Sequence, residues 1–125
     1  MFQNLTLVGR LGRDPEMRFT PAGQAVTNFS VATDRSYTKA DGTAVKETTW
    51  FRVETWGKAA EACNSYLHKG SLVMVIGRLK TDPETGCPRI YKTESGEVKA
   101  ANFEVVASTV KFLTPKGDGE HVEAE

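Results

Sequence analysis

The chain has 125 residues, of which 39% are hydrophobic and 26% are charged, and its formal net charge is zero. The length and composition fit one globular domain. The zero net charge by itself argues against a nucleic-acid partner. The chain has neither a membrane-length apolar run nor a basic segment followed by an apolar one, so we expect no membrane span, no secretory signal and a cytoplasmic protein. Because Cys63 and Cys87 lack CxxC spacing and nearby histidines, we expect free thiols and no metal site.

The charge is unevenly distributed along the chain. Residues 1–113 hold 15 of the 16 Lys and Arg and 12 of the 16 Asp and Glu, a balance of +3, whereas residues 114–125 hold one basic and four acidic residues, a balance of −3. We therefore predict a mildly basic domain over residues 1–113 and a short acidic tail over residues 114–125. The tail has too few apolar residues to be buried and is predicted to be disordered.

The first element predicted is a strand in NLTLVGRLG, with its leucines on one face and Gly9 between them at a bulge or bend. The next segment, DPEMRFTPAGQ over residues 14–24, contains two prolines and a glycine and is predicted to be a connection. A second strand is predicted over residues 25–33, AVTNFSVAT, with Phe29 and Val31 facing the core. An Asp-Gly turn at residues 41–42 then indicates a hairpin.

The third strand lies in TTWFRVETWGK, residues 48–58, and is followed by a change of period. The segment KAAEACNSYLHK predicts a helix, with Gly70 as its C-terminal stop. The face of that helix expected to be buried consists of Ala59, Cys63, Tyr66 and Leu67.

The last part of the domain contains two further predicted strands. One spans residues 71–79, SLVMVIGRL, and the other lies in AANFEVVASTVKFL. Between them, residues 80–98 form a punctuated excursion consistent with an extended hairpin. VGRLGRDPE at Val8 and IGRLKTDPE at Ile76 match at seven of nine positions when Val and Ile count as equivalent, which we interpret as two strands that leave a curved sheet in the same way.

The element order is therefore three strands, one helix and two strands, all short and interrupted by glycines. This order is typical of an all-β OB-fold, a five-stranded Greek-key barrel with a helix between strands 3 and 4, which binds oligonucleotides or oligosaccharides on one face.

The third strand places two tryptophans on the face expected to be wet. Successive strand residues point to opposite faces, so Phe51 and Val53 face the core. The other face carries Trp50, Arg52, Glu54 and Trp56. A lone tryptophan usually covers a core edge. Two beside cations favour base stacking, which contributes about 1–3 kcal/mol per base.

The basic residues are scattered rather than clustered, as on any solvated surface. They include Arg10, Arg13, Arg18, Arg35, Arg52, Lys58, Lys69, Arg78, Lys80, Arg89 and Lys92. As a set they suit a flexible phosphate backbone, because each neutralised phosphate contributes about −0.7 to the salt slope of single-strand binding. Arg52 is the strongest single candidate, since it shares the face of the two tryptophans.

Catalytic motifs are weak. His68 and His121 have no nucleophile in a recognisable motif. Two carboxylate pairs, Asp14 with Glu16 and Asp82 with Glu84, suggest a metal-dependent nuclease as an alternative, but each pair brackets a proline and fits a solvated turn better. We expect no enzyme activity, no cofactor and no metal.

The chain resembles the bacterial single-stranded DNA-binding protein family over most of residues 4–113. Three runs carry the resemblance: LVGRLGRDPEMRFTPAGQAVTNFSVAT, TTWFRVETWGKAAEACNSYLHKGSLVMVIGRL and EVVASTVKFL. The resemblance implies an OB-fold homotetramer that wraps single-stranded DNA in replication, recombination and repair, without catalysis, in the nucleoid-containing cytoplasm.

The resemblance also implies a set of site residues. Its stacking aromatics fall on Tyr37, Trp50 and Trp56, and on Tyr91 if the inserted segment TDPETGCPRI precedes it. Its DNA-contacting basic positions align with Arg18, Arg52, Lys58, Lys69 and Lys80.

The C-terminal segment departs from the family, whose members typically end in an acidic tip closing with Asp, Ile, Pro and Phe that docks replication and repair proteins. This chain ends EHVEAE, so we expect reduced recruitment of such partners and hypothesise that the tail screens the DNA groove when DNA is absent. The other open alternative is an OB-fold adaptor, such as a primosomal protein, whose aromatic face contacts another protein.

Overall fold

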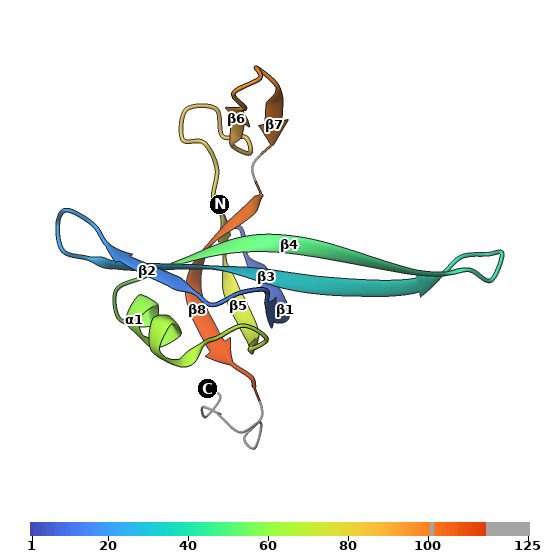
Figure 1. The fold of residues 1–125 in the computed structure, drawn as a ribbon, viewed down its shortest axis with the longest axis horizontal. Helices are drawn as coiled ribbons and strands as arrows, with labels where there is room; N and C mark the ends of the chain where they lie inside the picture. The colour runs from blue at the N-terminus through green and yellow to red at the C-terminus, as the bar shows by residue number, and fades with distance from the viewer. Residues whose placement is uncertain (101, 115–125) are drawn as a thin grey trace.

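The computed structural model describes residues 1–100 and 102–114 (Figure 1). The histidine at 121 and nearly all of the predicted tail fall outside these residues. In chain order the elements are β1 (Leu5–Leu11), β2 (Glu16–Phe19), β3 (Ala25–Thr38), β4 (Ala44–Trp56), α1 (Gly57–Tyr66), β5 (Leu72–Leu79), β6 (Ile90–Lys92), β7 (Val98–Ala100) and β8 (Phe103–Phe112).

Five strands close into a barrel in the order β1-β5-β8-β4-β3, with β3 pairing back to β1. All neighbours are antiparallel except β4 and β8, which are parallel. The helix α1 follows the third barrel strand, and the chain has the five-stranded OB-fold expected from the element order. The core is built from alternate strand residues that include Leu7, Phe29, Val53 and Val75.

Two glycines let the barrel strands approach closely. A Cβ atom on Gly9 would lie 2.2 Å from the carbonyl oxygen of Ala32, and one on Gly77 would lie 2.1 Å from that of Val106. These are the glycines shared by the two repeated nonapeptides, so the repeat marks equivalent close contacts between strands. Of the two alternatives predicted at Gly9, a bulge or a bend, the bulge was wrong, because β1 pairs there without interruption and the register shift lies between Ile76 and Gly77.

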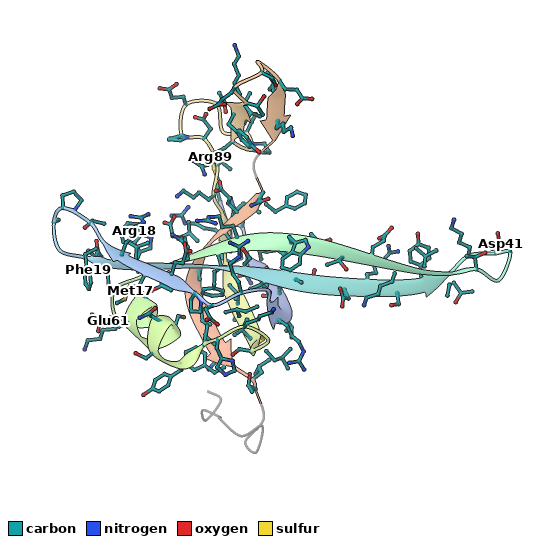
Figure 2. The ribbon with its side chains drawn as sticks, viewed as in Figure 1. Met17, Arg18, Phe19, Asp41, Glu61 and Arg89 are labelled. Carbon is teal, nitrogen blue, oxygen red and sulfur yellow. The ribbon has the colours of Figure 1, made fainter. Side chains whose placement is uncertain are left out.

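The hairpin of β3 and β4 is longer than predicted. The ladder runs from Val26 opposite Trp56 to Thr38 opposite Ala44, so the two strands continue past the barrel as a two-stranded ribbon (Figure 1). The Asp-Gly turn closes it, with Gly42 at φ 89° and the Thr43 amide donating to the Asp41 carboxylate at 2.9 Å. Figure 2 shows Asp41 at the far tip of this ribbon.

Three local predictions need correction. Residues 16–19 are not a plain connection but form β2, which pairs with the edge of β3. The helix buries Ala60 and Cys63, and Leu67 directly after it is also buried, whereas Ala59 and Tyr66 of the predicted face are exposed. It ends at Tyr66, where Leu67 returns to extended backbone, so Gly70 lies in the turn into β5 and is not a cap.

The predicted excursion forms a separate small unit, here called the arm and defined as residues 81–100. Its strands β6 and β7 pair with each other in a two-stranded sheet of their own. Figure 1 shows this hairpin standing away from the barrel. The excursion therefore contains a hairpin, as the sequence suggested, but its strands β6 and β7 pair with each other and not with the barrel strands. The single helix of the described residues is too short and polar to cross a membrane.

Candidate nucleic-acid interface

The outer face of β4 carries the two tryptophans, as the alternation predicts. Trp50 is 48% exposed and Trp56 is 38% exposed, whereas Val53 on the opposite face is fully buried. Arg52 lies between the rings and is also exposed. We call the outward-facing set Trp50, Arg52, Glu54 and Trp56 the tryptophan face. Neither ring belongs to the buried core cluster.

Register places one further predicted cation on this face. Arg18 of β2 pairs with Val26 of β3, which in turn pairs with Trp56 of β4. Residues directly opposite in a ladder share a face, so Arg18 and Trp56 project to the same side. Figure 2 agrees, because Arg18 lies on the side of β2 turned away from α1, whereas Met17 points toward the helix.

Glu54 is held between Trp56 and Lys80. Its carboxylate accepts a 2.6 Å hydrogen bond from the Trp56 indole Nε1 and a 2.6 Å bond from Lys80 Nζ at the end of β5. Burial acts to raise the pKa of Glu54, but the hydrogen bonds from Lys80 and Trp56 outweigh it and hold that pKa below its ordinary value. The hydrogen bond from the Trp56 indole to Glu54 fixes the edge of the ring and leaves the ring face available for other contacts. It also means that Lys80 must leave, or share, a carboxylate to contact a phosphate.

The loop after β1 completes the other end of the tryptophan face. A Cβ atom on Gly12 would lie 2.6 Å from the Trp50 ring, so the indole rests directly on this glycine. A depression of about 240 Å³ is lined here by Gly12, Arg13, Ser30, Trp50 and Asn102. An adjoining depression of about 130 Å³ shares Arg13, Ser30 and Asn102 and is also lined by Arg52 and by the acidic residues Asp14 and Glu16. These hollows offer guanidinium, hydroxyl and amide groups beside an exposed ring, a combination suited to phosphates and base edges.

Arg13, Asn102 and Gly12 are the residues that the sequence reasoning did not select for the site. Arg13 appeared only among the scattered cations, because a loop residue has no strand parity to place it. Asn102 lies 50 residues after Arg52 in sequence, so only the fold brings it to the face. Of these three residues, Gly12 has a local sequence signal, because it directly follows Leu11, the last residue of the β1 pattern.

The remaining basic candidates lie around the face rather than on it. Lys58 is exposed in the first turn of α1, two residues after Trp56. Lys69 lies in the turn between α1 and β5, where its amide donates a 2.8 Å hydrogen bond to the Asp14 carboxylate in the loop after β1. This bond holds the turn that contains Lys69 next to the loop that contains Asp14 and its neighbour Arg13.

The other two aromatic candidates are separated from the tryptophans. Tyr37 is 36% exposed on the two-stranded ribbon, and the β3–β4 register puts it with Arg35 and Glu47 on the face opposite to Trp50. The Arg35 guanidinium carbon lies 4.5 Å from the centroid of the Tyr37 ring, and the hydroxyl donates to Glu47 at 3.3 Å. Tyr91 is 53% exposed on β6, in the arm. The four aromatics therefore do not form one patch.

The carboxylates suggested for a nuclease are engaged in turns. Asp14 accepts the bond from the Lys69 amide, and Asp82 accepts a 2.9 Å bond from the Glu84 amide. Within residues 1–100 and 102–114 there is no group of three or more His, Cys, Asp or Glu side chains arranged to hold a metal ion. Cys63 is buried and Cys87 is exposed, and both are free thiols.

Comparison with known proteins identifies the family of this chain. The sequence pattern of the single-strand binding protein family matches residues 2–113. The chain belongs to this family. It is 41% identical over 116 residues to single-stranded DNA-binding protein B of Bacillus subtilis, covering 93% of this chain and 94% of that protein. It is 40% identical over 107 residues to the single-stranded DNA-binding protein of Neisseria meningitidis, covering 86% of this chain but only 57% of that one.

Solved structures give the same result for the fold. A deletion mutant of the single-stranded DNA binding protein from Thermus aquaticus superposes with a TM-score of 0.69 at 28% identity, covering 94% of this chain and 52% of that one. The Plasmodium falciparum single-strand binding protein, solved in complex with single-stranded DNA, has a TM-score of 0.75 over 90% of this chain and 96% of that one. At 24% identity the second likeness shows the OB-fold alone.

Proposed function

We propose that this protein binds and protects single-stranded DNA without regard to sequence, by stacking bases on Trp50 and Trp56 while cations hold the phosphates. The observation that carries the proposal is the pair of exposed indoles with Arg52 between them on one strand face. Every base has a π face, so stacking on an indole is sequence-tolerant. Phosphate contacts come from Arg52 and Arg13 on the face and its rim, with Arg18, Lys58, Lys69 and Lys80 around them.

The tryptophans are the core of the proposed interface, and Tyr37 and Tyr91 extend it along a longer strand. At about 1–3 kcal/mol per stacked base, the two indoles alone contribute roughly 2–6 kcal/mol. A micromolar complex corresponds to about −8 kcal/mol, so phosphate contacts or the two tyrosines supply the remainder. The same chemistry supports roles in replication, recombination and repair, where single strands are exposed, and requires no catalytic group. Wrapping of a strand around a homotetramer is part of the proposal.

Fluorescence anisotropy of a dye-labelled oligo(dT) tests the binding. We expect micromolar or tighter affinity for the single strand, weak binding to a duplex of equal length, and no cleavage of either when magnesium is added. Arg52→Ala should reduce the salt slope of binding by about 0.7, one phosphate contact. Equal binding to duplex with an unchanged slope would contradict the proposal and favour the adaptor interpretation. Removal of residues 114–125 should tighten binding at low salt if that segment screens the site, and unchanged affinity would reject the screening.

A further inference from the structure

The arm has little backbone connection to the barrel. Among the described strands, β6 and β7 pair only with each other. An isolated two-stranded hairpin is marginally stable in water and does not fix its own orientation. The position of the arm relative to the tryptophan face must therefore come from side-chain bonds and from its connections to β5 and β8.

Among the described residues, a side-chain ion pair between Arg89 and Glu104 joins the arm to the barrel wall. Arg89, just before β6, donates from Nε to Glu104 Oε1 at 2.6 Å and from Nη2 to Glu104 Oε2 at 2.5 Å. Glu104 belongs to β8, where it pairs with Arg52 of the tryptophan face. Figure 2 shows Arg89 where the small hairpin meets the barrel. The bond thus links the arm to a residue adjacent to the proposed DNA path.

Because Glu104 is buried, its carboxylate needs the bond from Arg89. Glu104 is only 8% exposed, the lowest exposure of any charged residue in the described chain. A buried carboxylate is costly unless it is paired and hydrogen-bonded, and a planar guanidinium satisfies both of its oxygens at once. Other ion pairs of the arm and ribbon are exposed, such as Lys99 with Glu97 at 3.9 Å. Arg89 is therefore the specific partner of a buried charge.

We propose that Arg89 is a positioning residue for DNA binding: its two-pronged bond to Glu104 clamps the arm to the barrel, so that Tyr91 and Lys92 continue the single-strand path beyond the tryptophan face. Tyr91 follows Arg89 by two residues, so anchoring Arg89 limits where the exposed Tyr91 ring lies. This inference rests on the proposed function, and it assigns the inserted segment the task of lengthening the bound strand.

The competing role for Arg89 is direct contact with a phosphate, and Glu104→Gln separates the two. The glutamine keeps the shape of Glu104 but lacks its charge. If Arg89 acts through the clamp, Glu104→Gln and Arg89→Ala weaken binding alike, and the double variant is no worse than either single one. If Arg89 contacts phosphate directly, Glu104→Gln frees it and binding is maintained or tightened. Thermal melting of each variant checks that it folds.

The first measurement is affinity for oligo(dT) of increasing length, with Glu97→Gln as the matched control that removes an exposed carboxylate of the same arm. Oligonucleotides that fill only the tryptophan face should bind every variant equally. At greater lengths Arg89→Ala and Glu104→Gln should lose about five-fold or more in affinity, the equivalent of one stacked base, whereas Glu97→Gln should follow the original protein. The same length dependence in all variants would overturn the inference.

The second measurement needs no DNA. Cys87 is exposed in the arm and Cys63 is buried, so a maleimide dye attaches selectively to Cys87. Dye anisotropy in the free protein should fall for Arg89→Ala and Glu104→Gln but not for Glu97→Gln. An unchanged anisotropy would overturn the clamp even if DNA binding is strong. A fall in anisotropy in a protein that binds no oligonucleotide would instead reject the proposed function.

Discussion

The barrel and the arm both carry candidate stacking aromatics, but they hold them differently. Trp50 and Trp56 lie on β4, which pairs with β3 along its whole length and with β8 over residues 51–54. Tyr91 lies on a three-residue strand whose only described ladder is with β7. The barrel aromatics are therefore placed before DNA arrives, whereas the arm aromatic depends on one ion pair. Preorganised groups lose less conformational freedom on binding, so we expect most of the affinity to come from the barrel.

The largest effect should follow loss of both barrel rings. The double variant Trp50→Ala/Trp56→Ala should lose about 2–6 kcal/mol of binding free energy with little change in melting temperature, because both indoles are half exposed. Trp56→Ala alone should cost about 1–3 kcal/mol. Anisotropy titration and thermal denaturation measure the two quantities. Tyr66→Ala, an exposed aromatic on α1, is the matched control and should leave affinity unchanged. A large fall in melting temperature with intact binding would show that the rings belong to the core.

The buried and the exposed cysteine should affect the pH dependence of the free energy of unfolding differently. Burial raises the pKa of Cys63 to about 11, with a hydrogen bond to Thr55 opposing it. Below the ordinary thiol pKa of 9.0 the group is protonated in both the folded and the unfolded state and has no effect. Between that pH and about 11 only the unfolded chain loses the proton, so the free energy of unfolding should fall by about 2–3 kcal/mol as pH rises. Cys63→Ala should lack this component in urea titrations, whereas Cys87→Ala should retain it. Parallel pH profiles for all three proteins would contradict the buried thiol.

The arm ring should contribute less than the barrel rings. Tyr91→Ala should cost about 1 kcal/mol, at the lower end of the range for one stacked base, because ordering the arm offsets part of the gain. The effect should appear with long oligo(dT) and vanish with short oligonucleotides. Isothermal titration with both lengths measures it. A loss equal to that of Trp56→Ala, at every length, would show that the arm is as well ordered as the barrel.

The smallest effect tests how Trp50 is seated. A methyl group at Gly12 meets the far end of the indole at 2.6 Å, so Gly12→Ala should tilt the ring while the backbone stays in place. We expect a loss of at most about 1 kcal/mol in binding and a shift in tryptophan emission. Gly23→Ala is unsuitable as a control because its φ is positive, so Ala22→Gly in the same surface turn serves instead. An unchanged emission spectrum would show that Trp50 does not rest on the glycine.

The fold and half of the interface were accessible from the sequence because they depend on local periodicity. Strand alternation placed Trp50, Arg52 and Trp56 together, and element order gave the barrel. β2 was missed because its four residues lie between two prolines and have no clear alternation. The bond between Arg89 and Glu104 was missed because it joins a loop residue, which has no strand alternation to place it, to a residue of β8 that lies 15 positions later in the sequence.

Tyr37 shows that family resemblance alone, without the strand register, does not establish on which face of the ribbon a residue lies. The family resemblance implies a stacking role for it, yet the ladder puts it on the opposite face from Trp50, with Arg35 against its ring. Whether a bound DNA strand passes from the face of Trp50 to the face of Tyr37 depends on the twist of the ribbon, and the alternation of side chains does not predict that twist. Its role in stacking stays a prediction.

The most direct test of the account is the intrinsic tryptophan fluorescence during titration with long oligo(dT) and with a duplex of equal length, at low and high salt. We predict deep quenching by the single strand whose amplitude at saturation persists as salt rises, although more DNA is needed to reach it, because stacking on the indoles is not screened whereas the phosphate contacts are; the duplex should quench little. Equal quenching by both that disappears at high salt, or no quenching at all, would leave only a charged surface and contradict the stacking mechanism.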